Sequence, residues 1–219
     1  MPPVGLLLAG GAGRRMGRPK ALVELAGRPL LLRALDALRG GGCTPLVVVL
    51  GAAADQVAEL LPADVRAVVA ADWAEGMGAS LRAGLDALAR SAEATESPNA
   101  TESPIAAESS AAVEPSAVLV HLVDLPGVGA AAIARLAEAA STGPEVLARA
   151  SYRGVPGHPV LLGRSHWAGV RDSARGDAGA RGYLAGHPAL RLVECGDLAD
   201  PRDVDTPAAL WEFTERQTS

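Results

Sequence analysis

The chain has 219 residues, of which 49% are hydrophobic, 21% are charged and only 3% are aromatic, and its formal net charge is −5. This composition is typical of a globular protein with one sizeable core built from Leu, Val and Ala, so we expect residues 1–219 to form a single domain. The acidic balance argues against a nucleic-acid or membrane-surface binder, and no apolar stretch approaches the ~20 residues of a membrane span.

Apolar runs of strand length alternate with amphipathic stretches of helix length through the first 140 residues. We expect strands at 4–9, 45–51, 65–70 and 117–124, and helices at 29–39, 54–61, 80–91 and 129–140. Because the apolar runs are continuous rather than alternating, each strand should be buried on both faces, in a mostly parallel sheet that helices cover. The sequence therefore predicts a doubly wound, three-layer α/β/α fold.

Two segments depart from this alternation. Residues 92–116 read AEATESPNATESPIAAESSAAVEPS, with a near-repeat and few large apolar side chains, which predicts a low-complexity, disordered surface insertion. Beyond 145 we expect short strands around Gly and Pro turns, two short helical stretches, a strand at 190–195 and a last helix from 206 to about 216. This second half should cover the carboxyl edge of the sheet, where doubly wound folds bind ligands.

Cysteine and tryptophan usage carries no functional signal. Cys43 and Cys195 lie far apart and lack metal-ligand spacing, so we expect reduced thiols in a cytoplasmic protein. Trp73, Trp167 and Trp211 are expected to be packing residues, given how few aromatic side chains the core has.

The segment LLLAGGAGRRMGRPKAL, residues 6–22, places four cations on a glycine-rich loop directly after the first strand: Arg14, Arg15, Arg18 and Lys20. This local positive charge runs against the acidic balance of the chain. It favours a loop that wraps a nucleoside triphosphate (NTP). Backbone N–H groups of such a loop bind the phosphates, and its basic side chains neutralise their charge.

Three other interpretations fit the loop less well. A dinucleotide loop reads GxGxxG, whereas Gly11, Gly13 and Gly17 give GxGxxxG, and Gly51 stands where the ribose-binding acid is expected. A Walker-type loop needs GK[ST], which RPKA does not supply. A plain glycine turn with solvated arginines leaves the interleaving of cations and glycines unexplained.

The loop resembles the signature LAxGxSxRMGxxK of the nucleotidyltransferase family that attaches a nucleotide to molybdopterin. Later segments resemble the motifs of this family in the same order: EGMGASLRAGL (75–85), LVDLPGV (122–128), GVPGHPVLLGRSHW (154–167), GDAGARGYLAGHP (176–188) and DVDTPAAL (203–210). The similarity covers the chain apart from 92–116. It implies the Rossmann-like fold of the nucleotide-diphospho-sugar transferase type.

The resemblance implies that an acceptor phosphate attacks the α-phosphorus of the NTP and releases pyrophosphate, with Mg²⁺ as cofactor. Catalysis would rest on Arg15 beside the departing pyrophosphate, Lys20 between the α- and β-phosphates, and Asp124 on the metal. The implied nucleotide-binding residues are Leu8, Ala9, Gly10, Gly11, Gly13, Arg14, Arg15, Lys20 and Ser80. Ser80 would contact the base or ribose, although it also suits a helix cap.

A second metal-binding carboxylate is expected in DVDTP, with Asp205 preferred. Alternation along an extended chain would point Asp203 and Asp205 in opposite directions, so at most one should face the metal. Asp205 also suits the N-cap of the last helix, and Asp124 suits a cap before the helix near Gly127. On the acceptor side the resemblance points to His158, Asp177 and Arg181, each of which also has a structural interpretation.

The sequence leaves open which nucleotide is transferred and which molecule accepts it. Gly11 gives LAGG, the usual form in the guanylyl-transferring branch, whereas the C-terminal segments resemble the cytidylyl-transferring branch, which we place first. Expected partners are CTP or GTP, a molybdopterin-type phosphate acceptor, and a molybdoenzyme or its maturation factor. Other small phosphate acceptors, and a module that holds the cofactor without turnover, remain alternatives.

Overall fold

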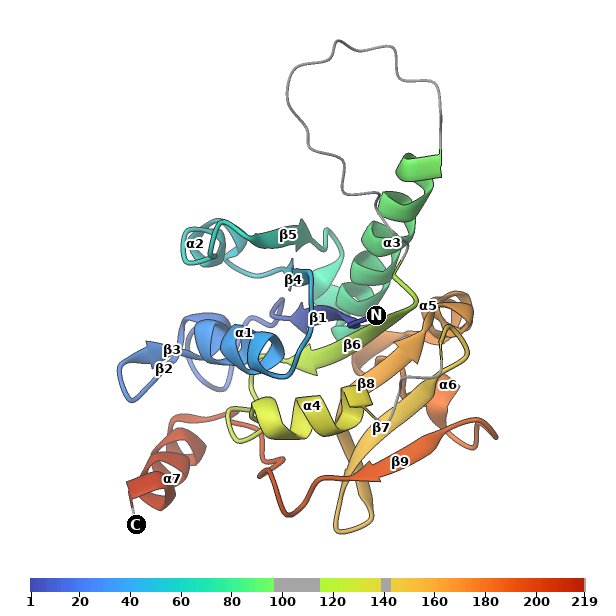
Figure 1. Cartoon of the computed structure of the whole chain (residues 1–219). Coiled ribbons are helices and arrows are strands. Elements are labelled where there is room, and N and C mark those ends of the chain that lie inside the picture. The colour runs from blue at the N-terminus through green and yellow to red at the C-terminus, as the bar shows by residue number, and fades with distance from the viewer. Residues whose placement is uncertain (97–114, 139–142, 219) are drawn as a thin grey trace.

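The computed structural model describes residues 1–96, 115–138 and 143–218 (Figure 1). Seven strands form one sheet in the order β5-β4-β1-β6-β8-β7-β9. Their bounds are β1 Val4–Leu8, β4 Leu46–Leu50, β5 Val65–Val69, β6 Ala117–Leu122, β7 Leu147–Tyr152, β8 Val155–Gly163 and β9 Arg191–Glu194. All neighbouring pairs are parallel except the two that involve β8, which confirms a mostly parallel sheet.

Helices cover both faces of the sheet (Figure 1). One face packs against α1 (Leu30–Gly40), α2 (Ala54–Ala58), α4 (Ala130–Glu138) and α7 (Pro207–Thr218). The other face packs against α3 (Met77–Glu96), α5 (Trp167–Ser173) and α6 (Arg181–Leu184). Short 3-10 helices at Lys20–Leu22, Trp73–Glu75, Arg164–His166 and Gly176–Ala178 and a hairpin of β2 (Glu24–Leu25) and β3 (Arg28–Pro29) complete the elements. The predicted three-layer fold is confirmed.

The core divides along the alternation of each strand. On β1, Leu7 points into the cluster that contains Leu31 of α1 and Ile133 of α4, whereas Leu6 points into the cluster that contains Leu81 of α3. Every residue of β1 and β4 is buried, as expected for central strands with helices on both sides.

The prediction of two-sided burial is wrong for β5. This strand lies at the edge of the sheet, and its Arg66 is exposed while Val69 is 62% exposed. An edge strand pairs on one side only, so an apolar run can lie there without being enclosed.

Helix α3 runs to Glu96, so it extends into the 92–116 segment that composition predicts as an insertion. Residues 97–114, which make up most of that prediction, lie outside the described residues. None of the helices in the described ranges combines the length and hydropathy needed to cross a bilayer. Cys43 and Cys195 are buried free thiols, and burial raises the pKa of Cys43 to about 12.

Glu194 ties the outer strand β9 to the turn between β7 and β8. Its carboxylate accepts hydrogen bonds from the backbone N–H groups of Arg153 (2.7 Å), Gly154 (3.1 Å) and Gly196 (2.9 Å), and from the hydroxyl of Ser151 (2.9 Å). These hydrogen bonds, those of Arg153 and Gly154 first, lower the pKa of Glu194 to about 2.

We therefore predict that Glu194→Gln lowers the free energy of unfolding near neutral pH. A carboxyl whose pKa is lower in the folded state stabilises above about pH 5, and this contribution is lost as the pH falls toward 2. Urea unfolding of wild type and variant between pH 7 and pH 3 checks this: the stability difference should shrink as the pH falls. A difference that stays constant with pH contradicts the assignment.

Candidate active site

A cavity of about 370 Å³ opens at the carboxyl ends of β1 and β6, beneath the glycine-rich loop. Parallel strands bring their carboxyl ends to one edge of the sheet, and β6 lies directly beside β1. The loop, the ends of the two strands and the start of α3 form its walls. The lining residues are Leu8, Gly10–Arg14, Lys20, Trp73–Met77, Ser80, Leu122–Asp124 and Asp177.

The loop doubles back on itself at Gly13. Its φ is +61°, and a Cβ at this position would lie 1.9 Å from the carbonyl oxygen of Arg18. Gly13 also accepts a hydrogen bond from the backbone N–H of Met16 at 2.9 Å. At Gly11, by contrast, a Cβ would meet no atom within 4 Å. The tight turn therefore depends on Gly13, while Gly11 faces open space.

Gly51 follows β4, where a dinucleotide-binding fold would place an acidic side chain on the ribose. A Cβ at Gly51 would lie 2.5 Å from the carbonyl oxygen of Gly10 and 2.7 Å from Cβ of Trp73. The backbone of the loop and Trp73 thus fill this position. The structure leaves no room for a ribose-binding acid after β4.

Three charged side chains from distant parts of the chain meet beside the cavity. Nζ of Lys20 lies 2.6 Å from Oδ2 of Asp124, which follows β6, and it also donates to Oδ1 of Asp205, which precedes α7. The three side chains are only 16–18% exposed. The backbone N–H of Val204 donates to the carbonyl of Asp124 at 2.9 Å, which holds the two segments together.

Arg15 joins this cluster from the solvent side, because its Nη2 lies 2.5 Å from Oδ2 of Asp205. Its own side chain is 73% exposed, so it is free to follow a ligand at the mouth of the cavity. Asp205 therefore has one oxygen toward Lys20 and the other toward Arg15.

The charges shift one another's pKa. Burial alone would lower the pKa of Lys20, but the carboxylates of Asp124 and Asp205 outweigh it, and the pKa is raised. Burial would raise the pKa of Asp205, but the hydrogen bond and the charge of Lys20 lower it. For Asp203, burial, a hydrogen bond to Asp205 and the negative charges of Asp205 and Asp124 raise the pKa. Lys20 thus stays charged beside the ionised carboxylate of Asp205.

Two expectations about DVDTP are corrected. The carboxyls of Asp203 and Asp205 approach each other instead of pointing apart, because this segment is not an extended strand. The start of α7 is capped by Thr206, whose Oγ1 accepts from the N–H of Ala209 at 3.2 Å, rather than by Asp205. Asp205 is therefore committed to Lys20 and Arg15.

A second cavity of about 40 Å³ adjoins the first, and Met77 and Asp177 line both. It brings His158, Asp177 and Arg181 together, as well as Arg149 of β7. Sequence reasoning missed Arg149. The available signal was a lone arginine within the otherwise small or apolar run VLARA.

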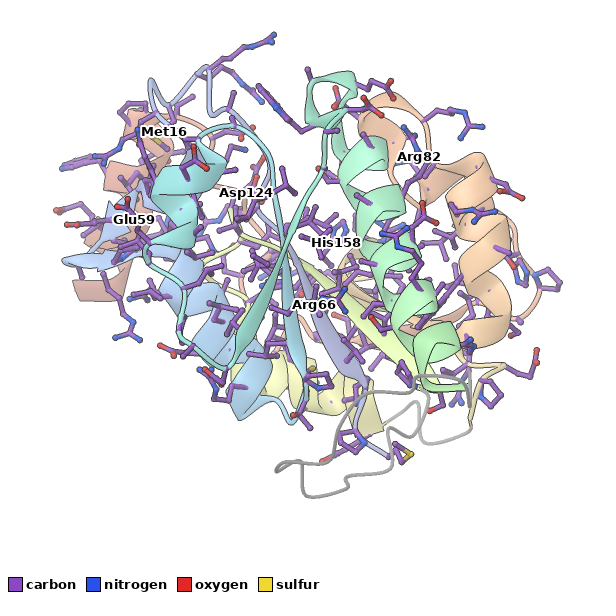
Figure 2. The ribbon with its side chains drawn as sticks, turned by 90° about the horizontal axis from the view of Figure 1, so that it is seen from above. Met16, Glu59, Arg66, Arg82, Asp124 and His158 are labelled. Atoms are coloured by element: carbon purple, nitrogen blue, oxygen red, sulfur yellow. The ribbon has the colours of Figure 1, made fainter. Side chains whose placement is uncertain are left out.

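Most of the sequence-predicted site residues line these cavities. Exceptions are Ala9, which is buried beneath the loop, and Arg15 and Asp205, which meet beside the larger cavity. Trp73 and Met77 line the larger cavity, although the sequence indicated no ligand role for them. In Figure 2, Asp124 lies between the loop segment that carries Met16 and helix α3, and His158 lies nearer to α3.

The glycine loop provides a matched pair of substitutions. We predict that Gly13→Ala lowers the stability by about 2 kcal/mol or more, because it combines a left-handed φ with a backbone clash. Gly11→Ala, where the added Cβ meets open space, should unfold at the wild-type temperature. Thermal unfolding of both variants checks this, and equal effects at the two positions contradict the loop geometry.

The comparisons with known proteins place the chain in a family. The family model described as MobA-like NTP transferase domain matches residues 5–192. A protein named nicotine blue oxidoreductase, from Paenarthrobacter nicotinovorans, is 36% identical over 221 residues, which cover 95% of each chain. A molybdenum cofactor guanylyltransferase from Rhodobacter capsulatus is 68% identical over 31 residues, which cover 14% of this chain and 16% of that relative.

Solved structures share the whole fold. The crystal structure of a homologue of Mycobacterium tuberculosis Rv0371c, from Mycobacterium sp. strain JC1, has a TM-score of 0.74 at 25% identity. The match covers 98% of this chain and 96% of that chain. The shared fold thus extends over nearly the whole chain.

Proposed function

Because the chain belongs to the family of MobA-like NTP transferase domains, and is a nucleotidyltransferase by that membership, we propose that it transfers a nucleotide from CTP to a molybdopterin-type phosphate acceptor. GTP is the alternative nucleotide. The observation that carries the proposal is the ammonium of Lys20, held between Asp124 and Asp205 at the rim of the glycine-loop cavity. A cation and two carboxylates at a phosphate loop are the groups that nucleotidyl transfer requires.

The proposed reaction needs positioning more than covalent participation by the protein. An oxygen of the acceptor phosphate attacks the α-phosphorus, and the bond from that phosphorus to the oxygen bridging toward the β-phosphorus breaks. Pyrophosphate leaves with the bonding electrons. Backbone N–H groups of Gly10–Gly13 would hold the phosphates, Lys20 would contact the α- and β-phosphates, and Arg15 would neutralise the charge that develops on pyrophosphate.

The carboxylates fit a divalent metal. Asp124 and Asp205 already converge on one cationic centre, the ammonium of Lys20, and carboxylate oxygens are the donors that Mg²⁺ prefers. No group of three or more His, Cys, Asp or Glu side chains that could hold a metal occurs among the described residues, so phosphate oxygens would complete the coordination. When bound, the ion would supply charge neutralisation at the triphosphate.

This arrangement couples Lys20 to the nucleotide. In the free chain the ammonium neutralises Asp124 and Asp205, and a divalent cation would have to compete with it. The triphosphate gives Lys20 a new anionic partner and thereby frees the two carboxylates. We therefore propose that metal and nucleotide bind together, with Lys20 moving from the carboxylates to the phosphates.

The order of the two nucleotides rests on the sequence. The segments 154–167 and 176–188 resemble the cytidylyl-transferring branch, and this favours CTP. Gly11 and the 31-residue similarity to a guanylyltransferase favour GTP. The open space at Gly11 fits either a glycine or an alanine. Direct competition between the nucleotides decides the order.

An oxidoreductase is the second candidate, because the relative named nicotine blue oxidoreductase matches 95% of both chains. Such an enzyme would use the glycine loop for the phosphates of a nicotinamide dinucleotide. The occupied position at Gly51 does not favour this candidate, since the usual ribose anchor cannot be placed there. Oxidation of NADH or NADPH by the purified chain with a dye acceptor, without pyrophosphate release from any NTP, would select it.

We predict that Asp124→Asn weakens Mg²⁺-dependent CTP binding about tenfold or more, because one carboxylate charge on the metal is lost. Calorimetric titration of CTP and GTP, with and without Mg²⁺, measures this. Asp36→Asn is the matched control, since Asp36 is an exposed carboxylate on α1 that pairs with Arg28. Equal binding by wild type and Asp124→Asn in Mg²⁺ would remove Asp124 from the metal site.

A further inference from the structure

Another cavity, of about 770 Å³, lies where the turn between β7 and β8, the segment after β9 and helix α7 meet. Figure 1 shows that segment running from β9 to α7. The volume is in the range of roughly 300–1,000 Å³ that is typical of small-ligand pockets. In the part of the chain that the structure describes, none of its lining residues also lines the glycine-loop cavity or the smaller cavity beside it. A ligand here would therefore leave the proposed nucleotide site free.

The turn presents Arg153 to this cavity from a fixed backbone. The φ of Arg153 is +54° and that of Gly154 is +80°, a left-handed pair that favours glycine or asparagine at both positions. The carboxylate of Glu194 accepts the backbone N–H groups of both residues and holds them in this conformation. Among the described residues, the guanidinium of Arg153 has no carboxylate partner. An arginine is thus held at a strained position with its charge unpaired.

The two aspartates that line the cavity, Asp197 and Asp200, are already paired. Nε of Arg202 donates to both carboxylate oxygens of Asp200, at 2.8 and 2.9 Å. The guanidinium of Arg135 donates to both oxygens of Asp197, at 2.5 and 2.9 Å. These hydrogen bonds lower the pKa of each aspartate, so both carboxylates stay ionised and occupied near neutral pH.

Arg216 lines the cavity from α7 and is only weakly paired. Its Nη2 lies 3.7 Å from Oε2 of Glu212, one helical turn earlier, and half or more of each side chain is exposed. Such a pair contributes little. Arg153, Arg202 and Arg216 thus face two aspartates, which leaves one positive charge in excess among the lining residues. A ligand with a single negative charge would balance it.

The cavity also has an apolar wall. Tyr152 and Phe213 line it and are 6% and 5% exposed. A Cβ at Gly127 would lie 3.1 Å from Cε2 of Phe213, so the backbone there packs closely against this ring. Leu198, which is 38% exposed, adds apolar surface. An aromatic ring suits this wall, because guanidinium groups also stack on aromatic faces.

We propose that this cavity binds an aromatic carboxylate, with the carboxylate between Arg153 and Arg216 and the ring against Tyr152 and Phe213. A planar guanidinium matches the two oxygens of a carboxylate, and the single charge of the ligand balances the excess charge of the cavity. The ligand is neither the nucleotide nor its acceptor. The inference uses none of the groups assigned to nucleotidyl transfer, so it does not rest on the proposed function.

The test uses the full chain labelled with ¹³C in phenylalanine. Phe213 is the only phenylalanine, so NMR follows one residue in the wall of this cavity without further assignment. Naphthoate is the probe, and it should shift the Phe213 signal in a saturable way. Naphthylmethanol, which has the ring without the charge, and acetate, which has the charge without the ring, should each bind about tenfold more weakly or less. Tighter binding of naphthyl phosphate than of naphthoate would overturn the carboxylate assignment.

Arg153→Met should weaken naphthoate binding about tenfold or more, and Arg153→Lys should weaken it less, because lysine keeps the charge without the planar fork. Methionine and arginine are both unbranched at Cβ, so the substitution adds no backbone strain to the turn. Arg216→Met gives a second test on another element and should also weaken binding.

The matched control is Arg14→Met, because Arg14 is an exposed arginine that lines the glycine-loop cavity instead. This variant should keep the wild-type affinity for naphthoate. An unshifted Phe213 signal, wild-type affinity in both Arg153→Met and Arg216→Met, or lost affinity in Arg14→Met would overturn the site. Each of these outcomes can be read whether or not CTP binds.

Discussion

The ion pairs of Lys20 with Asp124 and Asp205 join three segments that are distant in sequence. Lys20 follows the loop after β1, Asp124 follows β6, and Asp205 precedes α7. Because all three side chains are largely enclosed, separating them would leave charged groups without partners in a region of reduced solvent screening. The rim of the glycine-loop cavity therefore depends on the ammonium of Lys20. A metal and a triphosphate that bind there would have to share the partners of this ammonium.

The sheet explains why these charges can meet. β1 and β6 are adjacent and parallel, so the loop after one and the carboxylate after the other emerge at the same edge. The final segment before α7 is drawn to this edge by the hydrogen bond from Val204 to Asp124. The antiparallel β8 then adds the second half of the chain alongside β6, which brings Arg149, His158 and Arg181 beside the same cavity.

The sequence alone predicted the three-layer fold, because continuous apolar runs report buried strands, and it put the glycine loop and Asp124 each directly after such a strand. The choice of Lys20 and Asp124 as site residues came from the family resemblance. It did not predict the exposure of β5, which depends on strand order and not on composition. The approach of Asp203 to Asp205 was also missed, since alternation applies only to extended chain. Arg149 was missed because its place beside His158 and Arg181 is a property of tertiary packing.

We propose that Lys20 holds the two carboxylates in the free chain and yields them to a divalent cation when a triphosphate binds. Electron paramagnetic resonance of Mn²⁺, titrated into wild type and Lys20→Met with and without CTP, tests this directly. We expect weak Mn²⁺ binding to free wild type, tight binding with CTP, and binding to Lys20→Met without nucleotide. Equally tight Mn²⁺ binding to wild type with and without CTP, unaffected by Lys20→Met, would contradict it.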